Sequence, residues 1–272
     1  PKNQSLERYA QLQKCIGDIE RLRSNYDKAI GIYNSILFIF NILNIKLSNI
    51  KRLDTEIANV YKDKGYIYQT LGNANRSIYN YRLAEKNYRS VGEWYGVALA
   101  KRAIGYIIVA HNPDDIKGVG MLIESLRFFI KNKYYGAMTT CLESLSNVCI
   151  AKGDFDSAME HLNMSINIVG IKNIGGGNSL RKRGLLYMTL GDYDKSEVDL
   201  LESARVFRSL KSLRNEALVF SDIGELYGIT NRYGDAVEAY ERSVQLYGAV
   251  GLEQGRLDCQ NRLAEIRARM QS

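Results

Sequence analysis

Residues 184–200 read GLLYMTLGDYDKSEVDL, and this stretch decides the fold because its pattern recurs along the chain. Gly184 is followed twelve residues later by another small residue, Ser196, and sixteen residues later by the bulky Leu200. Six such pairs of small residues occur, the third of them one residue longer: Gly17 and Ala29, Gly65 and Ser77, Gly105 and Gly118, Ser146 and Ala158, Gly184 and Ser196, Gly224 and Ala236. Their first members lie 38 to 48 residues apart, a period typical of one supersecondary unit used repeatedly.

Each unit has the composition of two closely packed helices. A glycine within a helix costs about 1 kcal/mol relative to alanine, so its recurrence indicates a point where a neighbouring helix must come close. The small residues leave a notch on the helix surface. A bulky residue four positions after the second small residue lies on the same helical face and can fill the notch of the partner helix; these residues are Tyr33, Tyr81, Leu162, Leu200 and Tyr240. Turns such as Leu190-Gly191-Asp192-Tyr193 supply a glycine that can end one helix and a carboxylate that can cap the next.

These residues resemble the tetratricopeptide repeat family. The spacing of Gly184 and Tyr187, then Gly-Asp-Tyr-Asp at 191–194, is similar to the helix-turn-helix signature of that family, and the resemblance extends over about residues 10–250. The period near 40, with Pro1 and Pro113 the only prolines, resembles the extended-repeat branch, which includes scaffold proteins and the sensor portions of regulators. The resemblance implies an all-α, right-handed α-solenoid of about six repeats.

We expect one continuous array over residues 1–272. The expected repeats span roughly 10–50, 58–93, 97–134, 138–172, 177–212 and 216–250, and a capping helix spans 255–272. The cap is predicted because Leu263, Ile266 and Met270 lie on one helical face, which can cover the last repeat of a solenoid. A first helix of a seventh repeat is the alternative interpretation.

Composition limits the classes of protein. No run of apolar residues is long enough to span a bilayer; the nearest, Ile36–Ile45, predicts a buried helix or, alternatively, a face for self-association. Cys15, Cys141, Cys149 and Cys259 form no paired motif, which favours buried free thiols and a reducing, cytoplasmic location. Residues 1–136 carry a net charge of +9 (21 basic, 12 acidic) and residues 137–272 one of −2 (16 basic, 18 acidic), so the first half favours an acidic partner.

Catalytic chemistry is not indicated. The only histidines, His111 and His161, lie beside a turn and within a helix, and the glycine cluster at 175–177 lacks the lysine of a phosphate-binding loop and predicts a flexible joint between repeats. We therefore expect no enzyme activity, no catalytic residue, no metal site and no cofactor.

The resemblance implies that the first helix of each repeat lines an inner groove, with residues three before and one after the anchor glycine facing it. Four of the six residues in the first position are basic, more than the chain average of 37 in 272 would give. The candidate contacts for a peptide are Lys14, Lys62, Tyr66, Arg102, Tyr106, Asn147 and Arg181. Lys62 with Tyr66 and Arg102 with Tyr106 are expected to form cation–π neighbours. A solvated charged surface is the alternative.

Three functions remain open at this point. The favoured one is a non-enzymatic interaction scaffold that binds a protein or peptide, expected to be acidic, in the groove. The second is the sensor or regulatory module of a larger signalling protein or transcription regulator, binding an effector or signal peptide. Nucleic-acid binding is the least favoured, because basic and acidic residues are interspersed and no Arg-rich run occurs.

Overall fold

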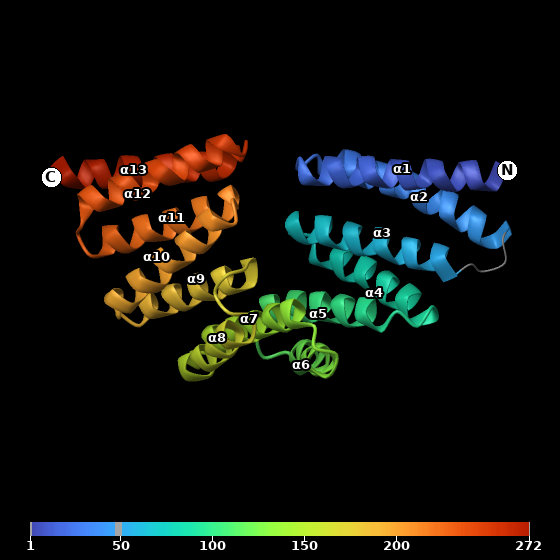
Figure 1. Ribbon diagram of the computed structural model, residues 1–272, viewed down its shortest axis with the longest axis horizontal. Helices are drawn as coiled ribbons and strands as arrows, with labels where there is room; N and C mark the ends of the chain where they lie inside the picture. The colour runs from blue at the N-terminus through green and yellow to red at the C-terminus, as the bar shows by residue number, and fades with distance from the viewer. Residues whose placement is uncertain (1, 47–50, 272) are drawn as a thin grey trace. The chain divides into compact units, whose positions relative to one another are not determined.

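The computed structural model describes residues 2–46 and 51–271, which form thirteen α-helices and no strand (Figure 1). The chain divides into two compact units, residues 1–133 and 134–272. Unit 1 holds three helix pairs: α1 (Lys2–Leu22) with α2 (Tyr26–Lys46), α3 (Lys51–Thr70) with α4 (Ala74–Ser90), and α5 (Trp94–His111) with α6 (Ile116–Lys131). The prediction of an all-α chain of helix-turn-helix repeats is confirmed.

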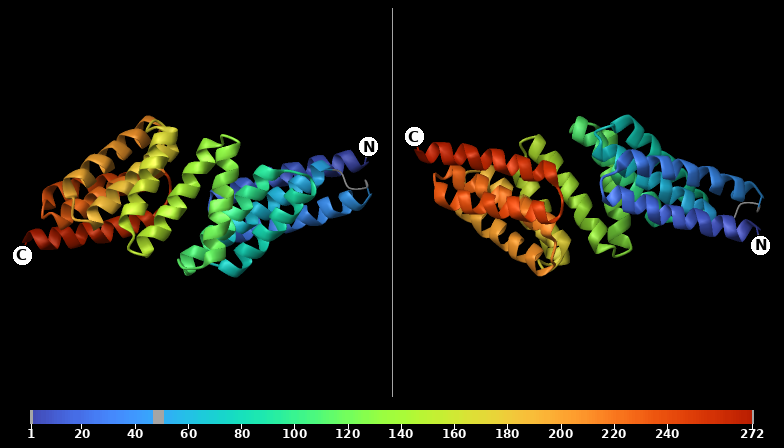
Figure 2. Two further views of the ribbon diagram at one scale, coloured as in Figure 1. Left: turned by 90° about the horizontal axis from the view of Figure 1, so that it is seen from below. Right: turned by 90° about the horizontal axis from the view of Figure 1, so that it is seen from above.

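Unit 2 has the same organisation and one additional helix. Its pairs are α7 (Tyr135–Ala151) with α8 (Phe155–Val169), α9 (Ile174–Thr189) with α10 (Tyr193–Ser209), and α11 (Leu213–Ile229) with α12 (Tyr233–Ala249), followed by α13 (Glu253–Gln271). The two helices of each pair lie side by side in all three ribbon views (Figures 1 and 2). The continuity of the array across the two units stays a prediction.

The anchor glycines Gly65 and Gly224 lie where the two helices of a pair are in close contact. A Cβ atom on Gly65 would lie 3.0 Å from the ring of Tyr81, and one on Gly224 would lie 2.9 Å from the ring of Tyr240. The second small residue adds a polar contact in one repeat, because the Ser77 hydroxyl donates to the Gly65 carbonyl at 2.7 Å. The contact between the anchor glycine and the bulky residue, predicted from the spacing, therefore joins the two helices in both of these pairs.

The turns within pairs have the predicted chemistry. Gly72, Gly153 and Gly191 adopt positive φ angles of 72°, 74° and 78°, the left-handed region that ends a helix at low cost for glycine. The residue after each of them is Asn or Asp, and its side chain accepts a hydrogen bond from the backbone N–H three residues on, as Asp192 does from Lys195 at 3.3 Å.

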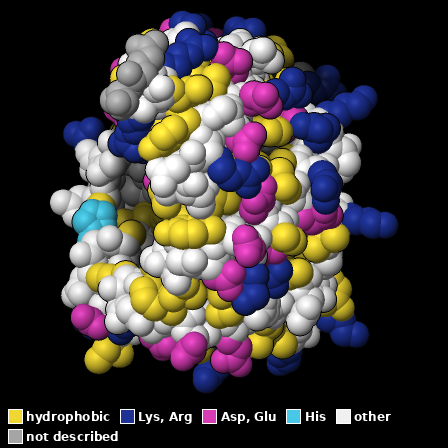
Figure 3. Space-filling view, turned by 90° about the vertical axis from the view of Figure 1, so that its left-hand side faces the viewer, with side chains coloured by type: hydrophobic (Ala, Val, Ile, Leu, Met, Phe, Trp, Pro, Cys, Tyr) yellow, Lys and Arg dark blue, Asp and Glu magenta, His cyan; other side chains and the backbone are white. Residues whose placement is uncertain are grey.

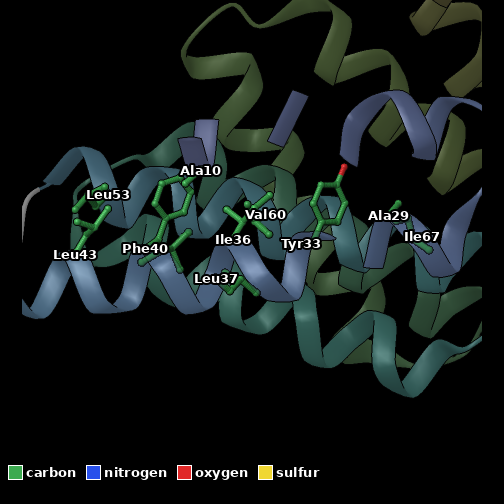
Figure 4. Close-up of a cluster of buried hydrophobic side chains, with 11 residues drawn as sticks. Ala10, Ala29, Tyr33, Ile36, Leu37, Phe40, Leu43, Leu53, Val60 and Ile67 are labelled. Carbon is green, nitrogen blue, oxygen red and sulfur yellow. The ribbon is translucent and has the colours of Figure 1, made fainter. Parts of the chain in front are cut away.

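The apolar segment Ile36–Ile45 forms the centre of the first core. Ile36, Phe40 and Leu43 are fully buried and pack between α1 and α3, as the stick view shows (Figure 4). Phe38 points away from this core and keeps 68% of its surface exposed. The prediction of a buried helix is confirmed for Ile36, Leu37, Phe40 and Leu43, whereas the side chains of Asn44 and Ile45 lie outside the described residues. None of the described helices has the length and hydrophobicity needed to cross a membrane.

Helix α13 covers the last pair of unit 2. Cys259, Leu263 and Ile266 are buried in one cluster with Tyr240 and Tyr247 of α12. The Ile266 side chain reaches the Gly228 position of α11. Met270, predicted to share this buried face, is instead 54% exposed, because the covered part of the helix ends one turn earlier.

Two further sequence-based expectations were wrong. The glycine cluster at 175–177 is not a flexible joint but the first turn of α9, where a Cβ atom on Gly177 would lie 2.8 Å from the ring of Phe207. Glycine is needed at position 177 because the two helices pack closely there, not because the backbone must be flexible. None of the four cysteines forms a disulfide within the described residues, yet only Cys141 and Cys259 are buried; Cys149 is half-buried and Cys15 is exposed on α1.

Candidate binding face on the first helices

The first helices of the repeats carry the charged residues predicted to bind a peptide. In unit 2, α7 contacts α9 and α9 contacts α11, so one face is built from first helices. In unit 1, side chains of α1 and α3 meet across the repeat boundary. We call these surfaces the first-helix faces. On the face of unit 1 lie Lys14, Asp18, Arg21, Lys62, Asp63 and Tyr66, and the sequence pattern assigns Arg102 and Tyr106 of α5 to it. On the face of unit 2 lie Glu143, Asn147, Arg181, Lys182, Asp222 and Glu225.

Lys14 joins two carboxylates on the unit 1 face. Its ammonium group lies 3.1 Å from Asp18, one turn further along α1, and 3.6 Å from Asp63 of α3. Asp18 also accepts a hydrogen bond of 2.5 Å from the Tyr33 hydroxyl. Burial lowers the pKa of Lys14, but Asp63 and Asp18 outweigh it, so the net shift of this pKa is upward. Lys14 therefore has its charge neutralised within the protein.

Tyr66 has a cation above its ring, although not the predicted one. The Arg21 guanidinium lies 5.6 Å from the centroid of the Tyr66 ring, which is the cation–π range, and Tyr66 is 43% exposed. No comparable contact joins Lys62 to Tyr66 or Arg102 to Tyr106 among the described residues, so those two pairings are corrected. The cation comes from α1, the neighbouring first helix, and not from the preceding turn of α3.

Three cations of the unit 1 face keep unused hydrogen-bonding capacity. The Nε atoms of Arg21 and Arg102 are buried and make no hydrogen bond within the described residues. Lys62 is 36% exposed and has only Asp63 within range, at 3.6 Å, an acid that Lys14 shares. Tyr106 packs partly against the core formed by Tyr81 and Ile104. Asp63, Asp18 and Glu56 all act on Lys14, so the cations of this face that keep spare hydrogen-bonding capacity are Arg21, Lys62 and Arg102.

On the unit 2 face, the predicted contact Arg181 has an internal partner. Both carboxylate oxygens of Asp222, on α11, accept from the guanidinium, the Nη2 contact being 3.1 Å long. Burial raises the pKa of Asp222, and Arg181 opposes that rise. This bidentate pair bridges α9 and α11 and leaves Arg181 without a free charge.

Asn147 belongs to a second internal network. Its side-chain oxygen accepts from the Lys182 ammonium at 3.4 Å, and the same ammonium lies 3.5 Å from Glu143. Glu143 is 9% exposed and accepts a further hydrogen bond from Ser179 at 3.2 Å. Acidic and basic side chains are also interspersed over the side of the molecule formed by the C-terminal helices (Figure 3).

The sequence interpretation named five residues of the unit 1 face and did not name Arg21 or Asp63. The five are Lys14, Lys62, Tyr66, Arg102 and Tyr106. Arg21 lies seven positions after Lys14, two turns along the same stripe, which was the available signal. Asp63 follows Lys62 directly and had no signal of its own, because its role depends on the position of α1. For the same reason, Asp222 and Lys182 were not predicted as the partners of Arg181 and Asn147.

Comparison with known proteins places the architecture among helical-repeat proteins. Residues 177–249 match the family model of the tetratricopeptide repeat. No curated protein sequence matches the chain. Within residues 2–46 and 51–271, no group of three or more His, Cys, Asp or Glu side chains could hold a metal ion.

Solved structures match almost the whole chain at low sequence identity. The Rap conjugation gene regulator of the plasmid pLS20, in complex with the Phr* peptide, aligns over 97% of this chain and 76% of its own with 15% identity and a TM-score of 0.68. Aspartyl phosphate phosphatase F from Bacillus subtilis aligns over 98% and 72% with 10% identity and a TM-score of 0.67. The apo form of the quorum sensor NprR from B. thuringiensis aligns over 96% and 77% with 9% identity and a TM-score of 0.61.

At these identities the likeness shows the fold. The protein is an all-α helical-repeat protein built of helix hairpins. The match to the tetratricopeptide repeat family model falls in α9–α12. The repeats of unit 2 have a period of 39 residues, since α7, α9 and α11 begin at 135, 174 and 213.

Proposed function

We propose that this protein is a non-enzymatic binding scaffold that holds an acidic peptide or protein segment on the first-helix face of unit 1. The observation that carries the proposal is the pair of guanidinium Nε atoms, of Arg21 and Arg102, that are buried without a hydrogen-bond acceptor, on a face where the acid nearest to Lys62 is already shared with Lys14. A buried donor without an acceptor is costly to leave unpaired. A ligand carboxylate would satisfy Arg21 and Arg102 and gain charge-assisted hydrogen bonds.

Tyr66 and Tyr106 add the second element of recognition. Tyr66 exposes its ring beside Arg21, so an apolar or aromatic ligand side chain can pack where the charge is also recognised. Support also comes from the Rap regulator that resembles this fold, because that protein was solved with a peptide. Asn147 and Arg181, also predicted as contacts, take a lesser part in the proposal, because unit 2 supplies their partners internally.

The test is a selection from a displayed library of random octapeptides, followed by titration of the enriched peptides. We expect peptides rich in Asp and Glu, and we expect Lys62→Gln with Arg102→Gln to weaken their binding at least tenfold while the melting temperature stays unchanged. Lys117→Gln with Arg127→Gln is the matched control, because both residues are exposed on α6 and the charge lost is equal. Peptides without acidic residues, or equal losses in both variants, would reject this face.

A second candidate is a sensor module of a larger signalling protein. It is favoured by the likeness to the quorum sensor NprR and to a signal-transduction ATPase with a tetratricopeptide repeat sensor from Pyrococcus horikoshii, which aligns over 98% of this chain and 42% of its own with 12% identity and a TM-score of 0.62. The full gene decides between the two, since a DNA-binding or ATPase segment beside these repeats would favour the sensor. A cytoplasmic location forms part of both proposals and rests on the free thiols.

The absence of catalysis is also a proposal, and it has a direct test. One protein of similar fold is named an aspartyl phosphate phosphatase. We expect hydrolysis of acetyl phosphate, a simple acyl phosphate, to proceed at the rate of buffer alone. A faster rate that depends on protein concentration would contradict a purely binding role.

A further inference from the structure

Unit 1 contains a cavity of about 510 Å³ between α2, α3 and α4, bordered by side chains that the proposed peptide face does not use. Three tyrosines, two cations, two asparagines and two leucines line it: Tyr61, Tyr68, Tyr79, Lys64, Arg76, Asn34, Asn80, Leu37 and Leu83. No Asp or Glu is among these lining residues, all of which lie in the described ranges. The cavity is therefore positive and aromatic.

Its two cations lie beside tyrosine rings rather than beside acids. Lys64 lies 5.8 Å from the centroid of Tyr61 and donates to the Asn34 side chain at 2.7 Å. Arg76 lies 5.6 Å from the centroid of Tyr68. Neither cation forms an ion pair within residues 2–46 and 51–271. Burial lowers the pKa of Lys64, as expected of an ammonium group whose charge has no acidic neighbour.

Asn80 is the independent sign of a ligand. It is 4% exposed, and its side-chain NH₂ group donates to the Arg76 carbonyl at 2.8 Å. Its side-chain oxygen is buried and accepts no hydrogen bond from the described residues. A buried acceptor at the wall of a cavity calls for an N–H or O–H donor inside it.

Unit 2 provides an internal comparison. A cavity of about 350 Å³ lies in the same register between α10, α11 and α12. Counted from the anchor glycines Gly65 and Gly224, the positions of Arg76 and Tyr79 are occupied there by Asp235 and Glu238. Its arginines are paired, Arg232 with Asp235 at 2.7 Å and Arg242 with Glu216 at 3.3 Å. The fold alone therefore does not require an uncompensated positive charge in this register.

We propose that the cavity between α2, α3 and α4 binds a small molecule that carries a phosphate or carboxylate group and an N–H donor on an aromatic ring. The anionic group contacts Lys64 and Arg76, with which it forms charge-assisted hydrogen bonds. The ring packs against the tyrosines, and the donor meets the Asn80 oxygen. The volume is within the range of cavities that hold small organic ligands.

Calorimetric titration with two probes tests the proposal and separates the two sources of the anion. Adenosine 5′-monophosphate carries a phosphate, a ring and an amino group, and 4-aminobenzoate carries a carboxylate, a ring and an amino group. We expect at least one probe to bind with a Kd below 1 mM. Adenosine, which lacks the phosphate, should bind at least tenfold more weakly than adenosine 5′-monophosphate. Benzoate, which lacks the amino group, should bind at least tenfold more weakly than 4-aminobenzoate.

Variants then locate the binding. Lys64→Gln with Arg76→Gln should weaken the active probe at least tenfold, and Tyr79→Ala, a change at a 63% exposed ring, should weaken it less. Arg82→Gln with Lys86→Gln is the control, because it removes the same charge from exposed positions of α4 outside the cavity. Failure of both probes at 1 mM, or equal weakening in the cavity and control variants, would overturn the proposal. The peptide selection is unaffected by either outcome, since the two sites share no residue.

Discussion

Unit 1 and unit 2 share their packing but differ in how their charges are neutralised. Gly65 with Tyr81 and Gly224 with Tyr240 make the same contact at the same register. On the first-helix faces, Arg181 of unit 2 meets Asp222, whereas the Nε atom of Arg102 in unit 1 is buried without an acceptor. The repeat therefore fixes where side chains stand, and the residues between the packing positions decide whether the charges of a face are neutralised internally or left without a partner.

The largest effect is expected from filling the shared notch. Gly65→Val and Gly224→Val should each lower the free energy of unfolding by about 3 kcal/mol, because the added side chain meets a buried tyrosine ring and cannot move into free space. Urea denaturation measures both. Gly31→Ala is the control, since no atom lies within 4 Å of the added Cβ and alanine favours a helix. A much smaller loss in one unit would break the claim that the two cores are equivalent.

Removing one arginine from each first-helix face should change the free energy of unfolding by different amounts in the two units. Arg181→Leu leaves the Asp222 carboxylate largely buried without its partner, which we expect to cost about 2 kcal/mol in unfolding free energy at pH 8. Arg102→Leu breaks no ion pair and should change that free energy by less than about 0.5 kcal/mol. Equal effects in the two variants would mean that the faces do not differ in the way described.

The cost of Arg181→Leu should also depend on pH. Burial already raises the pKa of Asp222, and loss of Arg181 removes the group that opposes the rise. When the pKa of an acid is higher in the folded than in the unfolded state, an increase in pH between these two pKa values favours unfolding. The variant should therefore recover stability as pH falls from 8 to 5. A pH-independent deficit would assign the loss to packing instead.

The smallest effect concerns the tyrosines that fill the notches. Burial raises the pKa of Tyr240 to about 12 and also raises the pKa of Tyr81. An unfolded tyrosine loses its proton near pH 10, whereas the folded one keeps it, so stability should fall as pH rises above about 10. Tyr240→Phe should reduce the alkaline loss between pH 9 and 11, measured as a shift of Tm, and Tyr81→Phe should do the same in unit 1. An unchanged alkaline slope in both variants would contradict this assignment.

The sequence was sufficient for contacts within a repeat and insufficient for contacts between repeats. The positions of Gly184, Ser196 and Leu200 define the packing of α9 on α10 because helical geometry relates residues at fixed spacings. Arg181 and Asp222 are 41 residues apart, and their meeting depends on the rotation of one repeat against the next, which no spacing encodes. The exposure of Cys15 and the packing of Gly177 on Phe207 also depend on that tertiary geometry.

The turns described above carry a consequence for how such a protein can change. Gly72, Gly92, Gly153, Gly191 and Gly251 hold left-handed turn positions, whereas Ser24, Lys133, Lys211 and Asn231 adopt the same conformation with a side chain present. Each such non-glycine residue stores about 1 kcal/mol of backbone strain. None of the four lines a first-helix face or the cavity of unit 1. Substitutions at these four turn positions can therefore change the stability of the protein without altering a residue of the first-helix faces or of the cavity.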